Sequence, residues 1–423
     1  MRTLILLLCA AGAFAETQTL TLRQALDLAL QQSPDLVIAR LDQERARYAV
    51  TIARDPFQPK VFAGSGAAYT TGFPASIDGA APSIFQARTQ MAIFDRPQSY
   101  QIAQAHENLR GAEIDVSKQQ DEIVFRVASL YLDAEQAART LEVAQRQTAS
   151  LARVLGILQA QSNEGNVLEL DVERAAVAVK RADLNVETLA EDVANTETSL
   201  AMALGLAPGD RVHPAAEERS PLAVPVSQEQ TIEAAIEANK DIRRLESNLQ
   251  AKMLDIKGYK AQRLPKINLI AQYELFGKYY YQNYYPVFQR NSAQFGASFD
   301  IPVLAGKSAH AYISQDDTDI AKIRVEISRT RAKISADLDH AFREVKHAEA
   351  VRDVARAELD LARKQVNVDL AQQEEGRLST AALEQARAAE NEKWLSYYDA
   401  QHLADRARLN ILHQTGTLLT ALR

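Results

Sequence analysis

The sequence predicts a mainly helical protein that also contributes strands to a membrane β-barrel. Three observations predict this class: a plan of elements that occurs twice, long helices with heptad spacing, and short segments in which apolar and polar residues alternate. The composition agrees, because 47% of the residues are hydrophobic but only 6% are aromatic. Such a composition suits helices packed along their length better than a thick globular core.

The duplication aligns residues 26–61 with residues 232–267 without a gap, at an offset of 206. Further along the chain, Gly165 matches Gly376 at an offset of 211. We therefore expect a first structural repeat over residues 16–205 and a second over residues 228–423, each of the form helix-strand-strand-helix-helix. The proline-rich segment 206–227 between them is the predicted linker.

The helices carry the strongest periodic signal. Ile123, Val127, Leu130 and Ala134 recur in steps of four and three, which is the seam of a coiled coil. The predicted helices span Leu22–Arg54, the segment from the second strand to Ser162, Leu168–Leu204, Gln228–Gln262, Ser308–Gln373 and Thr380–Thr417. The longest would measure about 100 Å at 1.5 Å per residue. A soluble coiled coil or bundle would show the same helices, so the strands decide between the two interpretations.

Four strands are expected, near residues 59–70, 85–94, 266–276 and 291–300. In the second of them, Phe85, Ala87 and Thr89 alternate with polar residues. Segments of about ten residues with this alternation are typical of outer-membrane barrels, which are apolar outside and polar inside. A half-buried sheet shows the same pattern. The export signal at the N-terminus, described below, favours the barrel. So does the lack of a globular domain that could cover one face of the sheet.

Four strands per protomer cannot close a barrel, and lipid does not tolerate open sheet edges. Two chains would give eight strands with a filled interior, whereas three give a 12-stranded barrel with a lumen. The polar inner faces therefore favour a homotrimer. The connecting loops, 71–83 and 277–290, lie at the outer end, and the tyrosines of the second suit a membrane interface. Those tyrosines could equally pack against each other.

The N-terminus is typical of an export signal. A positive start, an apolar run and an Ala-x-Ala site predict cleavage after Ala15, so residues 1–15 are the signal peptide. Cys9 is the only cysteine and lies within it, which excludes disulfides from the mature chain. Cys9 could instead be the attachment site of a lipid anchor, but Leu6, Leu7 and Leu8 before it do not include the small residue that such sites use. The net charge of −7 argues against nucleic-acid binding.

No pattern of catalytic chemistry is present. His340, Glu344 and His347 share one helix face, where they could form a metal site, but a solvated polar face explains the same residues. We find no H-E-x-x-H, Walker or dinucleotide motif. We therefore expect neither an enzyme nor a bound cofactor or metal.

Four motifs carry a resemblance to a known family. They are the opening Leu20–Leu30 with Ser33-Pro34-Asp35-Leu36, the turn Glu164–Val172, the turn Glu375–Ser379, and the strand-to-helix passage Gly296–Gly306 with Pro302. In this order, and together with the duplication, the chain resembles the TolC-like outer membrane efflux proteins, also called outer membrane factors.

The resemblance implies a trimeric exit duct in the outer membrane of a Gram-negative bacterium. Its 12-stranded barrel would continue into a long coiled-coil α-barrel across the periplasm, with segment 206–227 and the C-terminal end in an equatorial belt. The inner end would meet a periplasmic adaptor (membrane fusion) protein and an inner-membrane pump. The duct would passively conduct the substrates of a tripartite efflux or type I secretion system.

The resemblance also implies a gate at the periplasmic helix-turn-helix tips. Asp171 occupies the family's gate-aspartate position, and Arg377 would be its basic partner. The family's acidic ring positions fall on Ala382 and Gln385, so Glu374, Glu375 and Glu384 are the acidic substitutes nearby. A capped, solvated helix tip is the alternative, since exposed pairs contribute only about 0–1 kcal/mol. Gly165 and Gly376 are expected to form the turns with positive φ.

Two other classes of protein remain as rivals. A periplasmic coiled-coil adaptor or scaffold would carry a lipoyl-like domain and one helical hairpin, whereas this sequence predicts two hairpins and paired amphipathic strands. A helical metallohydrolase would need a ligand cluster that the sequence does not show.

Overall fold

The computed structural model describes residues 17–66, 83–207, 209–215, 222–225, 227–276, 291–302 and 307–422. The chain is mainly helical and divides into two compact units. The sheet unit comprises Ala39–Val116 and Lys240–Thr330, and the hairpin unit comprises Met1–Ile38, Ser117–Asn239 and Arg331–Arg423. The predicted signal peptide, and the predicted loops apart from Ser83, lie outside the described residues.

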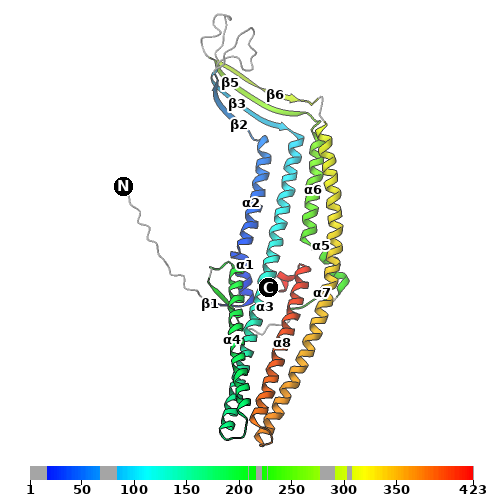
Figure 1. Cartoon of the computed structure of the whole chain (residues 1–423). Coiled ribbons are helices and arrows are strands. Elements are labelled where there is room, and N and C mark those ends of the chain that lie inside the picture. Colours follow the sequence, from blue (N-terminus) through cyan, green and yellow to red (C-terminus); the bar gives the residue numbers. More distant parts are fainter. Residues whose placement is uncertain are drawn as a thin grey trace, which may run out of the picture. The chain divides into compact units, whose positions relative to one another are not determined.

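The sheet unit contains a four-stranded antiparallel sheet in the order β2-β3-β5-β6 (Figure 1). Its strands are β2 (Lys60–Gly66), β3 (Ser83–Phe94), β5 (Lys266–Phe276) and β6 (Asn291–Asp300). β3 and β5 come from different halves of the sequence and pair over nearly their whole length. The duplicated strand pairs thus join into one sheet.

The strand register places most polar residues opposite polar ones and most apolar residues opposite apolar ones. Gln86 lies opposite Glu274, and their side chains are hydrogen-bonded at 2.8 Å. On the other face, Ala271 lies opposite Phe295. Because directly opposed residues share a face, one face is mainly polar and the other mainly apolar; Phe62 and Ile270 are apolar residues on the polar face. The apolar face is open, since Phe295 is 79% exposed.

Helices of the sheet unit are held together by polar contacts. They come from α2 (Pro34–Arg54), α6 (Lys240–Ala261) and the N-terminal parts of α3 (Arg96–Asn163) and α7 (Ser308–Glu374). Gln104 of α3 donates a hydrogen bond to Asp255 of α6 at 2.7 Å, and Lys252 of α6 pairs with Asp316 of α7 at 2.9 Å. These contacts fix α6 between α3 and α7.

Two helical hairpins make up most of the hairpin unit (Figure 1). The C-terminal part of α3 turns back into α4 (Glu169–Leu204), and that of α7 turns back into α8 (Thr380–Gln414). The two hairpins meet where α8 packs on α3: Arg406 binds Asp133 at 2.8 Å, and Gln136 binds Asp399 at 2.6 Å. The fully buried Tyr131, Leu338 and Leu409 belong to the core of this unit.

Short elements attach the chain's start and the linker to this unit. β1 (Thr17–Leu20) pairs in parallel with β4 (Arg211–Pro214), and Tyr131 of α3 donates a hydrogen bond to the Leu20 carbonyl at 3.1 Å. The short helix α9 (Leu418–Ala421) follows α8. Among the described residues, no helix combines the length and apolar character needed to cross a membrane.

The prediction of one uninterrupted opening helix in each repeat was wrong. The first helix is divided at Ser33 into α1 (Leu22–Gln32) and α2, and the second is divided at Asn239 into α5 (Gln228–Ala238) and α6. Ser33 has ψ 123° because a following proline disfavours the helical region, and Pro34 then opens α2. Asn239 adopts nearly the same conformation, with ψ 125°, although Lys240 and not a proline follows it.

Candidate functional site

The tips of the two helical hairpins have the same geometry. The α3–α4 turn covers residues 164–168, and the α7–α8 turn covers residues 375–379. In the first, the Gly165 and Asn166 amides donate to the carbonyls of Ser162 and Gln161; in the second, the Gly376 and Arg377 amides donate to those of Gln373 and Gln372. This pair of bonds is a Schellman motif, which satisfies the last carbonyls of a helix.

The motif explains the glycine in each turn. Gly165 and Gly376 have φ of 74° and 73°, in the left-handed region where a Cβ atom is costly. No heavy atom lies within 4 Å of the place that a Cβ would occupy on either glycine. The backbone conformation, and not crowding, therefore requires glycine at both tips.

Asp171 lies in the first turn of α4, where a carboxylate interacts favourably with the helix dipole. Its Oδ1 accepts a hydrogen bond from Arg174 at 3.2 Å, one turn further along the same helix. The side chain is 42% exposed. Within one chain, then, Asp171 is paired inside its own hairpin.

Arg377 is similarly paired inside the second tip. Its guanidinium lies 3.1 Å from the Glu375 carboxylate, and both side chains are exposed. Glu374, the last residue of α7, is exposed as well. No hydrogen bond or ion pair joins Asp171 to Arg377 in the part of the chain that the structure describes. The structure of one chain thus does not bring the two predicted partners together.

Glu384 has a different environment from the other acidic candidates. Its side chain is only 3% exposed and lies on α8, where Arg387 donates a hydrogen bond to it at 2.6 Å. Two further donors come from α3: Ser150 and, at 3.1 Å, Arg153. Glu384 therefore links the second hairpin to the first within one chain, and is not an exposed acid of the tip.

The hydrogen-bond donors lower the pKa of the Glu384 carboxyl by more than burial raises it. Burial alone would raise its pKa, but the hydrogen bonds from Ser150, Arg153 and Arg387, together with the charge of Arg153, hold its pKa below the usual value. The carboxylate is consequently charged at neutral pH. A buried charge with three donors is expensive to leave unpaired, so the contact holds α8 against α3.

Sequence reasoning missed Ser150 and Arg153. Arg387 lies three residues after Glu384, and helical spacing alone would have placed the two side chains side by side. Ser150 and Arg153 are more than 230 positions away from Glu384 in the sequence. Only the packing of α8 on α3 brings them to the same place.

The alternative metal site is not supported by the geometry. His340 Nδ1 lies 3.8 Å from the Glu344 carboxylate, and these two side chains and His347 are exposed on α7. Among the described residues, no group of three or more His, Cys, Asp or Glu side chains is arranged to hold a metal ion. The pattern at these positions is that of a solvated helix face.

Comparisons with known proteins agree with this architecture. Residues 25–206 match the family model described as outer membrane efflux protein. The outer membrane efflux protein BepC of Brucella suis biovar 1 (strain 1330) is 21% identical over 266 residues, which are 63% of this chain and 54% of BepC. The matched region thus spans about half the length of that relative.

Solved structures share the fold over nearly the whole chain. The CmeC outer membrane channel of Campylobacter jejuni superposes with a TM-score of 0.74 at 13% identity, covering 94% of this chain and 86% of CmeC. The outer membrane protein VceC of Vibrio cholerae gives a TM-score of 0.71 at 14% identity, covering 93% of this chain and 96% of VceC.

Proposed function

We propose that this chain, whose residues 25–206 match the outer membrane efflux protein family, is the exit duct of a tripartite efflux or type I secretion system. Three copies would form the duct in the outer membrane of a Gram-negative bacterium. It would pass substrates outward without performing chemistry. An inner-membrane pump, connected through a periplasmic adaptor, would supply the energy.

The observation that carries the proposal is the two-faced sheet. Its apolar face is exposed, with Phe295 at 79% and Val61 at 74%, whereas Arg88, Gln86 and Glu274 lie on the opposite face. In water this much exposed apolar surface would be unfavourable, but lipid would cover it. The polar face would then line an aqueous lumen.

A lumen of this kind requires more than one chain. β2 and β6 form the two edges of the sheet within the described part of the chain. Edge strands cannot remain unpaired in lipid, so β2 of one protomer would pair with β6 of the next. Three protomers with four strands each give a barrel wide enough for water.

The long helices support the proposed passage across the periplasm. α3 has 68 residues and α7 has 67, so each is about 100 Å long. In the trimer they would line a coiled-coil tunnel, with residues 206–227 and the C-terminal end in a belt around it. The tips at Gly165 and Gly376 would face the adaptor.

We place the gate of this duct at the tips, with two kinds of contact. Asp171 and Arg377 are exposed and each pairs within its own hairpin, which leaves them available to a neighbouring protomer. Glu384 instead holds α8 to α3 within each protomer. Opening would therefore require Asp171 and Arg377 to separate between chains, and α8 to shift on α3 within each chain.

The experiment that tests the proposal is the mass and heat stability of the protein extracted in detergent from outer-membrane fractions. We expect a trimer by light scattering, and a band that shifts on electrophoresis only after heating. A monomer or dimer in the soluble periplasmic fraction would overturn the duct and favour a coiled-coil scaffold.

A further inference from the structure

The hairpin unit contains a cavity of about 540 Å³ that the proposed gate does not use. Its walls are formed by side chains of α1, α3, α7, α8 and α9, together with Leu222 of the linker. This volume lies within the range of pockets that bind small molecules. The cavity lies far along α8 from the hairpin tip, since the turn at the tip ends at Ser379 and the first residue of α8 that lines the cavity is Tyr397.

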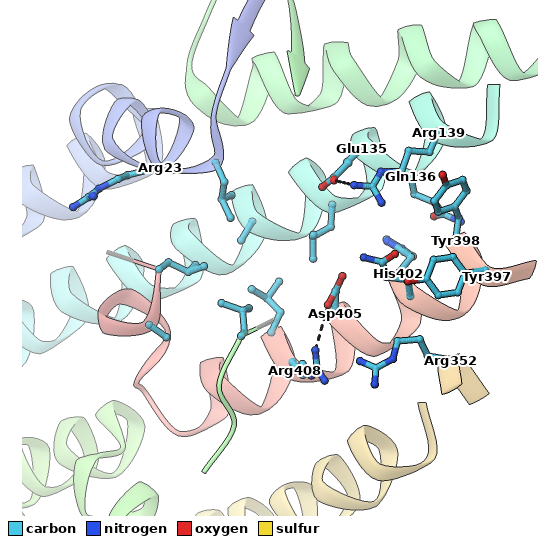
Figure 2. Close-up of a pocket in the computed structure, with 18 of the residues that line it drawn as sticks. Arg23, Glu135, Gln136, Arg139, Arg352, Tyr397, Tyr398, His402, Asp405 and Arg408 are labelled. Carbon is cyan, nitrogen blue, oxygen red and sulfur yellow. Dashed lines mark hydrogen bonds and ion pairs between the residues drawn. The ribbon is translucent and has the colours of Figure 1, made fainter. Parts of the chain in front are cut away.

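Aromatic rings line one end of the cavity. Tyr397 and Tyr398 of α8 both face it, with their ring centroids 5.9 Å apart, and the guanidinium of Arg139 on α3 lies 5.4 Å from the Tyr398 centroid. Figure 2 shows the two tyrosines beside His402, between Arg139 on one wall and Arg352 on the other. Aromatic faces flanked by guanidinium groups are suited to stacking with a further planar ring.

The charged groups that line the cavity are mostly basic. Five arginines contribute, against the two carboxylates of Glu135 and Asp405, a difference of three positive charges; the arginines are Arg23, Arg139, Arg352, Arg356 and Arg408. A cavity with this excess would attract an anion.

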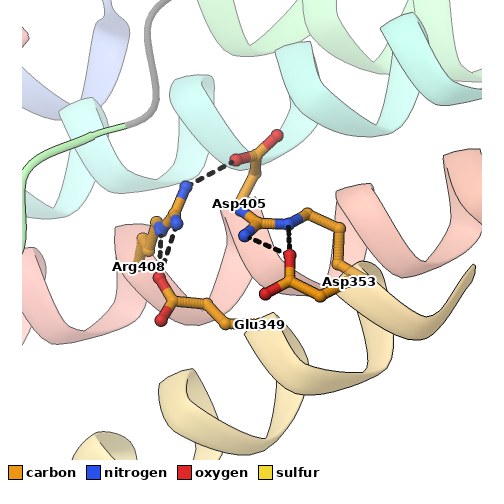
Figure 3. Close-up of polar contacts among 5 residues, drawn as sticks. Glu349, Asp353, Asp405 and Arg408 are labelled. Atoms are coloured by element: carbon orange, nitrogen blue, oxygen red, sulfur yellow. Dashed lines mark hydrogen bonds and ion pairs between the residues drawn. The ribbon is translucent and has the colours of Figure 1, made fainter. Parts of the chain in front are cut away.

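Some of these arginines are already neutralised. Arg139 binds Glu135 at 2.6 Å, and Arg352 binds Asp353 at 2.7 Å. Arg408 donates to Glu349 of α7 and lies 3.7 Å from Asp405, as Figure 3 shows. Of these pairs, Arg408–Glu349 joins α8 to α7 at the wall of the cavity.

Arg356 is different, because the structure gives it no hydrogen bond or ion pair with any described residue. It lies four residues after Arg352, so the two side chains occupy the same face of α7. Arg356 can therefore provide the positive charge that the paired arginines do not.

We propose that this cavity binds small organic anions that carry an aromatic ring, such as aromatic carboxylates. The ring would stack on Tyr397 and Tyr398, and the acid group would be bound by Arg356 beside Arg352. A neutral aromatic compound would lose the charge interaction, and an aliphatic acid would lose the stacking. The inference goes beyond the exit duct, since passive conduction requires no such site.

The test is isothermal titration calorimetry on the full-length protein in detergent, with 2-naphthoate as the probe. We expect saturable binding, and binding at least tenfold weaker for the neutral 2-naphthamide and for cyclohexanecarboxylate. Trp394 is the only tryptophan of the chain and lies 5.3 Å from the Tyr398 ring, so its fluorescence provides a second measure of the same binding.

A pair of matched variants locates the site. Arg356→Gln should weaken 2-naphthoate binding about fivefold, the upper range for one partly exposed charge pair. Arg343→Gln is the control, because Arg343 is also an exposed arginine of α7 but lies outside this cavity. Tyr398→Leu should weaken binding by removing a stacking surface.

Three results would overturn the proposal: no saturable binding, equal binding of 2-naphthamide, or equal effects of Arg356→Gln and Arg343→Gln. The mass of the same preparation keeps this outcome separate from that of the duct. A trimer that does not bind 2-naphthoate overturns only the anion site, and a soluble monomer that binds it overturns only the duct.

Discussion

At the scale of single residues, the most consequential side chain is Glu384. It is among the few charged side chains that the structure buries, and its donors come from both α3 and α8. The exposed ion pairs of the tips are worth about 0–1 kcal/mol each, whereas a buried charge that loses its partners costs several times more. Among the polar contacts between the hairpins, we therefore expect the Glu384 contact to contribute the most to stability.

We predict that Glu384→Gln lowers thermal stability by about 1–3 kcal/mol, because the amide keeps the shape but not the charge that Arg153 and Arg387 bind. Glu374→Gln is the matched control, since Glu374 is exposed and should tolerate the change. Thermal unfolding followed by circular dichroism measures both. Equal melting temperatures for the two variants would show that the Glu384 contact does not hold the hairpins.

The same contact predicts a dependence on pH. The pKa of Glu384 is held below its ordinary value of 4.5, so folding favours the charged carboxylate. Its contribution is present above pH 4.5 and is lost as the pH falls through the lower folded pKa. The difference in stability between wild type and Glu384→Gln should therefore shrink as the pH falls below 4.5.

The pKa of Asp255 in the sheet unit is shifted in the opposite direction from that of Glu384. Burial, and then the nearby charge of Asp316, raise its pKa, so folding favours the protonated form. Its charge destabilises the fold at pH values above the ordinary pKa of 3.8. We predict that Asp255→Asn raises the melting temperature at pH 7, where Asn can still accept the hydrogen bond from Gln104.

The comparison that tests this is the same pair of proteins at a pH below 3.8, where protonation removes most of the Asp255 charge from both the folded and the unfolded protein and the advantage of Asn should shrink. A lower melting temperature for Asp255→Asn at pH 7 would mean that the attraction of Lys252 exceeds the cost of burial.

At the scale of elements, the hairpin turns show how the backbone determines sequence. Each turn has five residues and the same Schellman bonds, although only the glycine and the glutamate before it are shared between residues 164–168 and 375–379. The two turns also differ in how they cap the helix that follows. The Ser379 side chain accepts a hydrogen bond from the Ala382 amide at the start of α8, whereas Leu168 makes no side-chain hydrogen bond at the start of α4.

We predict that Gly376→Ala destabilises the protein by about 1–2 kcal/mol, because alanine is unfavourable at a φ of 73°. Gly156→Ala is the matched control: Gly156 lies within α3, and no heavy atom approaches its Cβ position within 4 Å. That change should stabilise by up to about 1 kcal/mol. The melting temperatures should therefore move in opposite directions, and a shift in the same direction would contradict the account.

The tips also determine the prediction for the gate. Asp171→Ala combined with Arg377→Ala should raise single-channel conductance in planar bilayers, since the proposed contacts between protomers would be lost. Glu173→Ala, an exposed change in the same turn of α4, is the control. If conductance stays at the wild-type level in the double variant, other residues hold the tips closed.

At this scale the sequence predicts structure where the signal lies in neighbouring residues. It does not predict contacts that arise only when distant helices pack together. Pro34 marks the break in the first opening helix at Ser33. No proline follows Asn239, so the equivalent break in the second repeat could be predicted only from the duplication, which aligns Asn239 with Ser33. The long helices were predicted because heptad spacing extends over many turns. The Glu384 contact was not, because Ser150 and Arg153 come from another helix.

At the scale of the whole molecule, the proposed function depends on which solvent each face of the sheet meets. Neighbouring residues of β6 provide a direct comparison. Ala297 lies opposite Leu269 on the apolar face, and Ser298 lies opposite Asn268 on the polar face. The two positions differ by one residue along the strand, so they lie at nearly the same depth in any barrel.

We predict that Ala297→Lys prevents assembly of the heat-modifiable trimer in the outer membrane, whereas Ser298→Lys is tolerated. A lysine facing lipid near the middle of the bilayer costs about 2–4 kcal/mol in each strand that carries it, and a trimer would carry three. A lysine in the lumen stays hydrated and changes only the ion preference of the channel. Outer-membrane fractionation and unheated electrophoresis measure assembly, and equal assembly of both variants would mean that the apolar face does not meet lipid.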